Sequence, residues 1–268
     1  MATVLIPIPA RDFDPTETAV PWKVLTQRGH GVRFATPDGR PGRADERMLT
    51  GAGLGIWKSI LMADSNGRQA YTEMIASPAF AAPQCWDDLG ERAFDALLLP
   101  GGHAPGMKPY LESQVLQDLI VDTFVKRKPL GAICHGVLLV ARSRGPDGQS
   151  VLLGKKTTAL PKQLELTAWA MTGLWLKNYY RTYPTTVQEE VTRALARPTD
   201  FLVGPTALVR DAPDKLDVGF TLRDENYLSA RWPGDAHRFA VEFGKLLDAA
   251  VGAPSFLAKQ ARQHAAAL

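Results

Sequence analysis

Short apolar runs alternate along the chain with longer stretches in which apolar residues recur at helical spacing. Four runs predict buried strands, at residues 4–8, 32–35, 96–99 and 130–133, and two weaker runs predict strands at 201–203 and 227–230. Wholly apolar runs such as "ALLL" are typical of parallel strands whose sheet is covered on both faces. The pattern therefore predicts an α/β fold in which a mainly parallel sheet lies between two layers of helices.

The predicted helices have recognisable ends. Asp14 and Pro15 open the first helix and Gly29 closes it. An amphipathic helix is expected within 111–127, after a loop rich in Gly and Pro, and the last strong helical pattern covers 234–251. Thr186 is followed three residues later by Glu189, which is the signature of a capping box at the start of another helix.

Two stretches interrupt this alternation. Residues 37–68 contain many glycines and little periodicity, and residues 162–200 are helical and rich in aromatic side chains between 169 and 183. A structureless loop of such length is uncommon in a compact domain, so we interpret both stretches as excursions that cover a site. We expect one domain over 1–250, with a cap-like insertion at about 162–200, followed by a C-terminal tail at 251–268.

Composition narrows the class of protein further. The net charge of +3 comes from acids and bases mixed along 268 residues, which does not favour a nucleic-acid partner. Two cysteines argue against a disulfide framework and are typical of a cytoplasmic protein. The first residues are interpreted as a strand rather than a signal peptide, and no apolar run approaches the ~18 residues that span a bilayer, so no membrane partner is expected. The histidines lack paired ligand spacing, and "GAGLG" at 51–55 does not follow an apolar strand, so neither a metal nor a nucleotide cofactor is expected.

The most informative stretch is "GAICHGVLLV", where a predicted strand ends at Cys134 and a helical pattern begins at once. Ligands of open parallel sheets bind beyond the carboxyl ends of the strands. A helix that starts there directs amide N–H groups at the sulfur, which would lower the pKa of the thiol. We therefore predict a nucleophile elbow, with an exposed sulfur on a strained backbone. Cys85 has none of these features and is predicted to be structural.

The residues around this elbow provide the other groups that a thiol nucleophile needs. His135 is the candidate general base. Gly101 and Gly102 follow the strand at 96–99, and the amides of Gly102 and His135 could form an oxyanion hole. His103 is expected near the rim of the same site.

Four blocks in this order resemble the ThiJ/PfpI superfamily of the class I glutamine amidotransferase-like fold: "ETAVPWKVLTQRGHGVRFATPDG", "FDALLLPGGHAPG", "AICHG" and "LSARWPGDAHRFA". The resemblance implies a flavodoxin-like three-layer α/β/α sandwich. It also implies that Cys134 is the nucleophile and that a protonated Glu17 hydrogen-bonds to its sulfur. His135 makes the chain most similar to the bacterial chaperone and glyoxalase III branch, in which Glu165, where Asp is more frequent, would complete a triad with Cys134 and His135.

The resemblance implies a cofactor-independent enzyme that acts on small reactive carbonyls, in the manner of a glyoxalase III that converts methylglyoxal to lactate. Two alternatives stay open. One is a cysteine peptidase or amidase that uses Cys134, His135 and Glu165, and the other is a stress-response holdase or redox sensor. Relatives commonly form homodimers, so a homodimer is expected. The aromatic stretch at 169–183 could line a pocket, close a lid or form a dimer surface.

Overall fold

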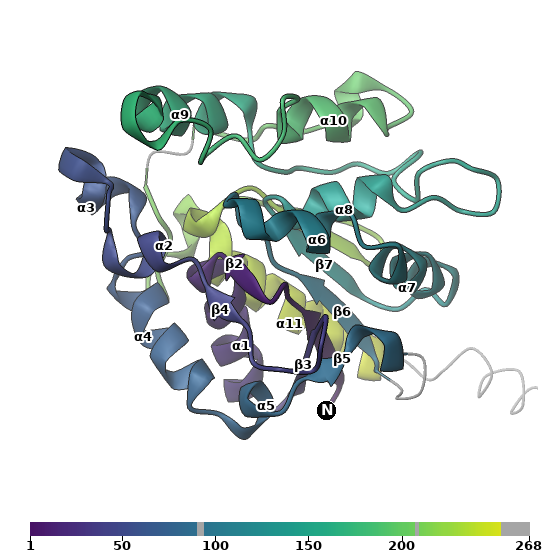
Figure 1. Cartoon of the computed structure of the whole chain (residues 1–268). Helices are drawn as coiled ribbons and strands as arrows, with labels where there is room; N and C mark the ends of the chain where they lie inside the picture. Colours follow the sequence, from purple (N-terminus) through teal and green to yellow (C-terminus); the bar gives the residue numbers. More distant parts are fainter. Residues whose placement is uncertain (90–93, 207–208, 253–268) are drawn as a thin grey trace, which may run out of the picture.

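A seven-stranded sheet runs through the middle of the protein (Figure 1). The structure is a computed structural model, and it describes residues 1–89, 94–206 and 209–252. The strands lie in the order β5 (Gln84–Cys85), β3 (Gly31–Thr36), β1 (Thr3–Pro7), β6 (Ala96–Leu99), β7 (Leu130–Ile133), β9 (Tyr227–Ala230) and β8 (Thr221–Asp224). All neighbouring pairs are parallel except β8 and β9. The apolar strands β1, β6 and β7 occupy the centre, as parallel strands covered on both faces should.

Helices cover both faces of this sheet. On one face lie α1 (Pro15–Gln27), α4 (Ser65–Ile75), α5 (Pro78–Ala81) and α11 (Ala236–Gly252), where α1 packs against β3, α4 and α11. On the other face lie α6 (Lys108–Leu111), α7 (Gln114–Val125) and α8 (Gly136–Arg142), where α7 packs on β6 and α8 on β7. The predicted three-layer α/β/α sandwich with a mainly parallel sheet is confirmed.

The two predicted excursions have structures of their own. The first contains β4 (Arg43–Ala44), which pairs with β2 (Arg11–Phe13), and then α2 (Glu46–Thr50) and α3 (Lys58–Leu61). The second contains α9 (Lys162–Leu176) and α10 (Val187–Arg193), which lie together along one end of the molecule (Figure 1). Met48 and Leu54 of the first pack with Tyr180 of the second in a small apolar cluster separate from the main core. The two excursions therefore meet over the same end of the sheet.

The described residues also contain short 3-10 helices, at Gly55–Trp57, Trp86–Asp88, Pro105–Met107, Pro198–Asp200, Leu216–Val218 and Pro233–Asp235.

Several local predictions can be compared directly with the structure. The capping box is present, because Thr186 and Glu189 bond reciprocally at the start of α10. The strand predicted at 201–203 is wrong: Phe201 forms only an isolated bridge to Thr157. The predicted tail begins inside α11, and its residues beyond Gly252 lie outside the described part of the chain. No helix in the described residues is both long enough and apolar enough to cross a bilayer.

Candidate functional site

Cys134 lies directly after β7, in the turn that leads into α8. Its φ of 56° is in the left-handed region, which is uncommon for a residue other than glycine. The turn also requires Gly136, because a Cβ there would lie 2.3 Å from the carbonyl oxygen of Leu99 on the neighbouring strand. On its other side, the Cys134 N–H donates to Ala230 O of β9 at 3.1 Å. These contacts hold Cys134 in a strained strand-to-helix turn at the carboxyl ends of the central strands, which is the backbone geometry predicted for the elbow.

The thiol itself is buried, which contradicts the expectation of an exposed sulfur. Cys134 is only 5% exposed. Burial raises the pKa of the thiol well above its usual value, and the carboxyls of Glu17 and Asp14 act in the same direction. The amide of His135 opposes this rise, as expected for a group at the start of a helix, but does not overcome it. The predicted lowering of the pKa is therefore wrong for this arrangement, in which the thiol keeps its proton.

Glu17 lies on α1, whose N-terminus is capped by Asp14, and it is completely buried. Its Oε2 accepts a hydrogen bond from the Gly101 N–H at 2.9 Å. Its Oε1 is buried without a hydrogen-bond partner in the described residues. Burial raises the pKa of Glu17 well above its usual value, and the nearby Asp14 carboxyl adds to the rise. A protonated Glu17 can therefore donate from Oε1 toward the neighbouring sulfur, as the sequence resemblance implied.

The imidazole of His135 lies between the thiol of Cys134 and the hydroxyl of Thr182, a residue that the sequence analysis did not identify. Its Nδ1 lies 3.5 Å from Cys134 Sγ, and its Nε2 lies 3.2 Å from Thr182 Oγ1. The Thr182 hydroxyl donates its single hydrogen to His103 O at 2.6 Å. It can therefore only accept from His135, so the imidazole hydrogen is on Nε2. Burial lowers the pKa of His135 to about 3, which leaves the ring neutral and Nδ1 free to accept the thiol proton.

Glu165 does not take the predicted third position of the triad. The residue is buried on α9, and its Oε2 accepts from the Val187 N–H at 2.9 Å, at the start of α10. Its Oε1 lies 3.4 Å from Arg181 Nε. Burial raises the pKa of Glu165 to about 7, against the opposing effects of the Val187 amide and Arg181. In the described structure, the Glu165 carboxylate therefore links α9 to the start of α10 and to Arg181, which directly precedes Thr182. Thr182, not Glu165, is the partner of His135.

The glycine loop after β6 lies against the elbow as predicted. A Cβ on Gly101 would lie 2.7 Å from the His135 nitrogen and 2.9 Å from the Cys134 Cβ, so only glycine allows this approach. Gly102 has a φ of 151°, which also favours glycine. Within the described residues, the Gly102 N–H donates to no backbone carbonyl. The His135 amide is directed at the sulfur. The His135 amide thus lies at the sulfur, whereas the Gly102 amide remains the predicted second donor for an oxyanion.

His103 lies at the outer side of the site, as expected. Its ring stacks on Tyr180 at 4.2 Å and meets Tyr179 edge-on at 4.9 Å. Burial lowers the pKa of His103 to about 3, so the ring is neutral. The aromatic stretch therefore packs against the site, and its tyrosines hold His103 in place.

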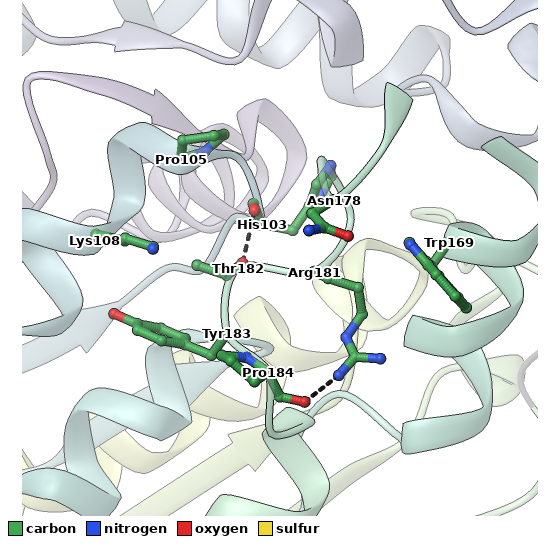
Figure 2. A pocket seen from close by; sticks show the side chains of 9 residues that line it. All are labelled: His103, Pro105, Lys108, Trp169, Asn178, Arg181, Thr182, Tyr183 and Pro184. Atoms are coloured by element: carbon green, nitrogen blue, oxygen red, sulfur yellow. Dashed lines mark hydrogen bonds between the residues drawn. The ribbon is translucent and has the colours of Figure 1, made fainter. Parts of the chain in front are cut away.

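A pocket of about 480 Å³ opens beside this residue (Figure 2). Its lining comes from the loop after β6 and from the second excursion, and consists of His103, Pro105, Lys108, Trp169, Asn178, Arg181, Thr182, Tyr183 and Pro184. Thr182 contacts both His103 and His135. Thr182 thus connects the pocket lining to His135, whose Nδ1 lies 3.5 Å from the sulfur of Cys134. The sequence indicated the aromatic residues of this region but gave no sign of Thr182.

Cys85 is half-buried on the edge strand β5, where its sulfur donates to Pro37 O at 3.1 Å. This agrees with the structural role that was predicted for it. Within residues 1–89, 94–206 and 209–252, no group of His, Cys, Asp and Glu side chains is arranged to hold a metal ion.

Comparison with known proteins gives a family and several relatives. The model of the family described as "ThiJ/PfpI family-like" matches residues 8–205. A DJ-1 homolog D of Arabidopsis thaliana is 30% identical over 161 residues, which are 60% of this chain and 36% of that protein. A glutathione-independent glyoxalase of Schizosaccharomyces pombe is 25% identical over 165 residues, which are 60% of this chain and 64% of that protein. The alignments thus span between about a third and two thirds of these relatives.

Solved structures support the fold. The glyoxalase III of Candida albicans superposes with a TM-score of 0.64 and 17% identity, covering 91% of this chain and 97% of that one. Drosophila melanogaster DJ-1beta superposes with a TM-score of 0.53 and 14% identity, covering 91% of this chain and 89% of that one. At these identities the likeness concerns the arrangement of helices and strands.

Proposed function

Because the chain belongs to the ThiJ/PfpI-like family, we propose that it is a cofactor-independent enzyme that converts small 2-oxoaldehydes, such as methylglyoxal, to 2-hydroxy acids. One observation carries the proposal: the thiol of Cys134 faces the free Nδ1 of a neutral His135, with the acid Glu17 beside it. This set can attack a carbonyl and move protons without a metal or an organic cofactor. Relatives named as glyoxalases support the same class of reaction.

The first step forms a hemithioacetal. As the sulfur of Cys134 attacks the aldehyde carbon, the thiol proton passes to His135 Nδ1, and the carbonyl electrons move to the oxygen. The amides of Gly102 and His135 stabilise the negative charge that develops there. Glu17 donates a hydrogen bond from Oε1, which favours the sulfur anion during the transfer. His135 then returns its proton to the oxygen.

The following steps move hydrogen within the substrate. His135 removes the proton from the former aldehyde carbon while the neighbouring carbonyl oxygen takes up a proton, which gives an enediol. His135 then delivers its proton to the neighbouring carbon while the hydroxyl of the former aldehyde carbon loses its proton, which leaves a 2-hydroxyacyl thioester on Cys134. Water hydrolyses this thioester, releasing the 2-hydroxy acid and the free thiol. One substrate carbon is oxidised and its neighbour is reduced, so the reaction needs no external oxidant or reductant.

The burial of Cys134 weighs against a peptidase and against a redox sensor. A peptidase needs space for an extended peptide at the nucleophile, whereas Cys134 is only 5% exposed. A redox sensor needs a thiol that is accessible and ionised, whereas burial keeps Cys134 protonated. A small carbonyl compound is more compatible with this enclosed site.

The direct test is lactate formation from methylglyoxal in the absence of glutathione, measured with a lactate-specific enzymatic assay. We expect the protein to produce lactate in proportion to the methylglyoxal consumed. Consumption of methylglyoxal without lactate would indicate adduct formation on surface amines. No consumption at all would exclude methylglyoxal as a substrate.

Replacing Thr182 should disturb the protonation of His135. Thr182→Val removes the acceptor for Nε2–H, so the hydrogen is no longer fixed on Nε2, and we expect kcat to fall roughly ten- to a hundredfold, since positioned general bases contribute about 10²–10⁴-fold. Thr182→Ser keeps the hydroxyl and should recover most of kcat. The measurement is kcat and KM as a function of pH for both variants. Equal losses in the two variants would assign Thr182 a packing role only.

A further inference from the structure

The pocket beside the site is larger than a three-carbon aldehyde requires. Its volume of about 480 Å³ is in the range of cavities that hold much larger organic ligands. Such a pocket would leave most of its lining without contact to methylglyoxal. The chemistry of the lining side chains therefore indicates which further groups a preferred substrate would have.

The polar groups that line the pocket are mainly hydrogen-bond donors. Lys108 and Arg181 both line it, on either side of the segment that carries Thr182 and Tyr183, and Asn178 and Trp169 add amide and indole N–H groups (Figure 2). No Asp or Glu side chain is among the lining residues. Donors and cations without a carboxylate are the lining expected of a cavity that binds an anion.

The two cations differ in how far their charge is already compensated. Lys108 contacts the ring of Tyr183, with Nζ 5.4 Å from the ring centroid, and forms no ion pair within the described residues. Arg181 lies 3.4 Å from the buried Glu165 and donates from Nη2 to Pro184 O. Lys108 therefore supplies an unpaired positive charge to the pocket, and Arg181 supplies a guanidinium fixed in orientation by its two partners.

The pocket is also connected to the reacting groups through a series of side-chain contacts. Its lining includes His103 and Thr182, and Thr182 contacts His135 at 3.2 Å, which in turn lies 3.5 Å from the sulfur. A ligand in the pocket would thus lie next to the residues that adjoin the thiol. We propose that the preferred substrates are 2-oxoaldehydes that carry a carboxylate or phosphate, and that this pocket binds the anionic group through Lys108 and Arg181. The proposal rests on the carbonyl chemistry proposed for Cys134.

The test compares pairs of compounds of similar shape that differ in charge. Phenylglyoxal is compared with 4-carboxyphenylglyoxal, and hydroxypyruvaldehyde with its phosphate ester, so the two pairs distinguish carboxylate from phosphate. We expect the anionic member of at least one pair to have the higher kcat/KM. Lys108→Met should reduce that anionic-to-neutral ratio roughly five- to tenfold, in keeping with a partly exposed ion pair, and Lys108→Glu should reduce it further.

Lys126→Met is the matched control, because Lys126 is an exposed lysine just after α7 that pairs with Asp122 and is not among the pocket-lining residues. It should leave the ratio unchanged. The proposal is overturned if neither pair shows an anionic preference, or if Lys108→Met lowers both members of a pair equally.

A binding measurement separates this proposal from the catalytic one. In the Cys134→Ala protein, calorimetry should detect 4-acetylbenzoate, an unreactive keto acid, binding more tightly than acetophenone, with the difference lost in the Cys134→Ala/Lys108→Met protein. If no substrate is turned over but this difference is found, the anion pocket stands while the glyoxalase-type reaction does not. If no difference is found, the anion pocket is wrong whatever the reaction.

Discussion

Cys134→Ala is expected to abolish lactate formation, with kcat reduced on the order of 10³-fold or more, as for other enzymes that lose a covalent nucleophile. The proposed path forms a bond between substrate carbon and this sulfur, and no other thiol lies in the site. The substitution keeps a Cβ at a position whose φ is already 56°, so the elbow should retain its geometry. The measurement is the initial rate of lactate formation at saturating methylglyoxal, with circular dichroism to verify folding.

Cys85→Ala provides a control within the same molecule. Cys85 is on β5, at one edge of the sheet, and three strands separate β5 from β7. Its sulfur bonds only to Pro37 O among the described residues, so its loss should leave kcat close to that of the unmodified protein. Lactate production that survives in Cys134→Ala but disappears in Cys85→Ala would place the chemistry elsewhere in the chain.

The central strands were predictable because burial on both faces leaves a strong signal in the sequence. Residues 96–99, 130–133 and 227–230 are strands with the bounds that the sequence predicted. The strands β2, β4, β5 and β8 were missed because they are two to four residues long, contain polar residues and do not occupy the centre of the main sheet. Their strand conformation depends on the neighbour with which they pair, and a single sequence does not reveal that neighbour.

The elbow was predictable because its geometry is local. A strand, a cysteine and a helix start follow one another directly, and Gly136 is required by the close approach to Leu99. The burial of Cys134 was not predictable in this way, because it arises when distant segments close over the thiol. Thr182 lies 47 residues beyond His135 in a loop without a motif, and only the folded chain places its hydroxyl on the imidazole. Glu165 had the charge expected of a triad acid, but Arg181 and the Val187 amide occupy its carboxylate.

The largest expected loss of stability comes from the buried ion pair behind the elbow. Arg231 and Asp235 are 1% and 0% exposed, and both carboxylate oxygens accept from the guanidinium at 2.9 Å. The same carboxylate also accepts from the N–H groups of Arg231 and Phe220. Asp235→Ala would leave a buried cation and two backbone donors unpaired, so we expect the free energy of unfolding to fall by about 3–5 kcal/mol. For a chain of this size, the melting temperature should fall on the order of 10 °C.

Denaturant unfolding of Asp235→Ala measures this loss, and Asp214→Ala is the matched control. Asp214 is an exposed aspartate from the same part of the chain, and its replacement should change the stability by less than about 0.5 kcal/mol. A double variant, Arg231→Met with Asp235→Leu, removes the isolated charge, so it should be less destabilised than the sum of its single variants.

Arg231 directly follows Ala230, whose carbonyl accepts the Cys134 N–H, so the ion pair also fixes the strand end that supports the elbow. Asp235→Ala should therefore lower kcat even at temperatures where the protein stays folded, and an unchanged kcat in folded protein would show that the elbow holds its geometry without this support.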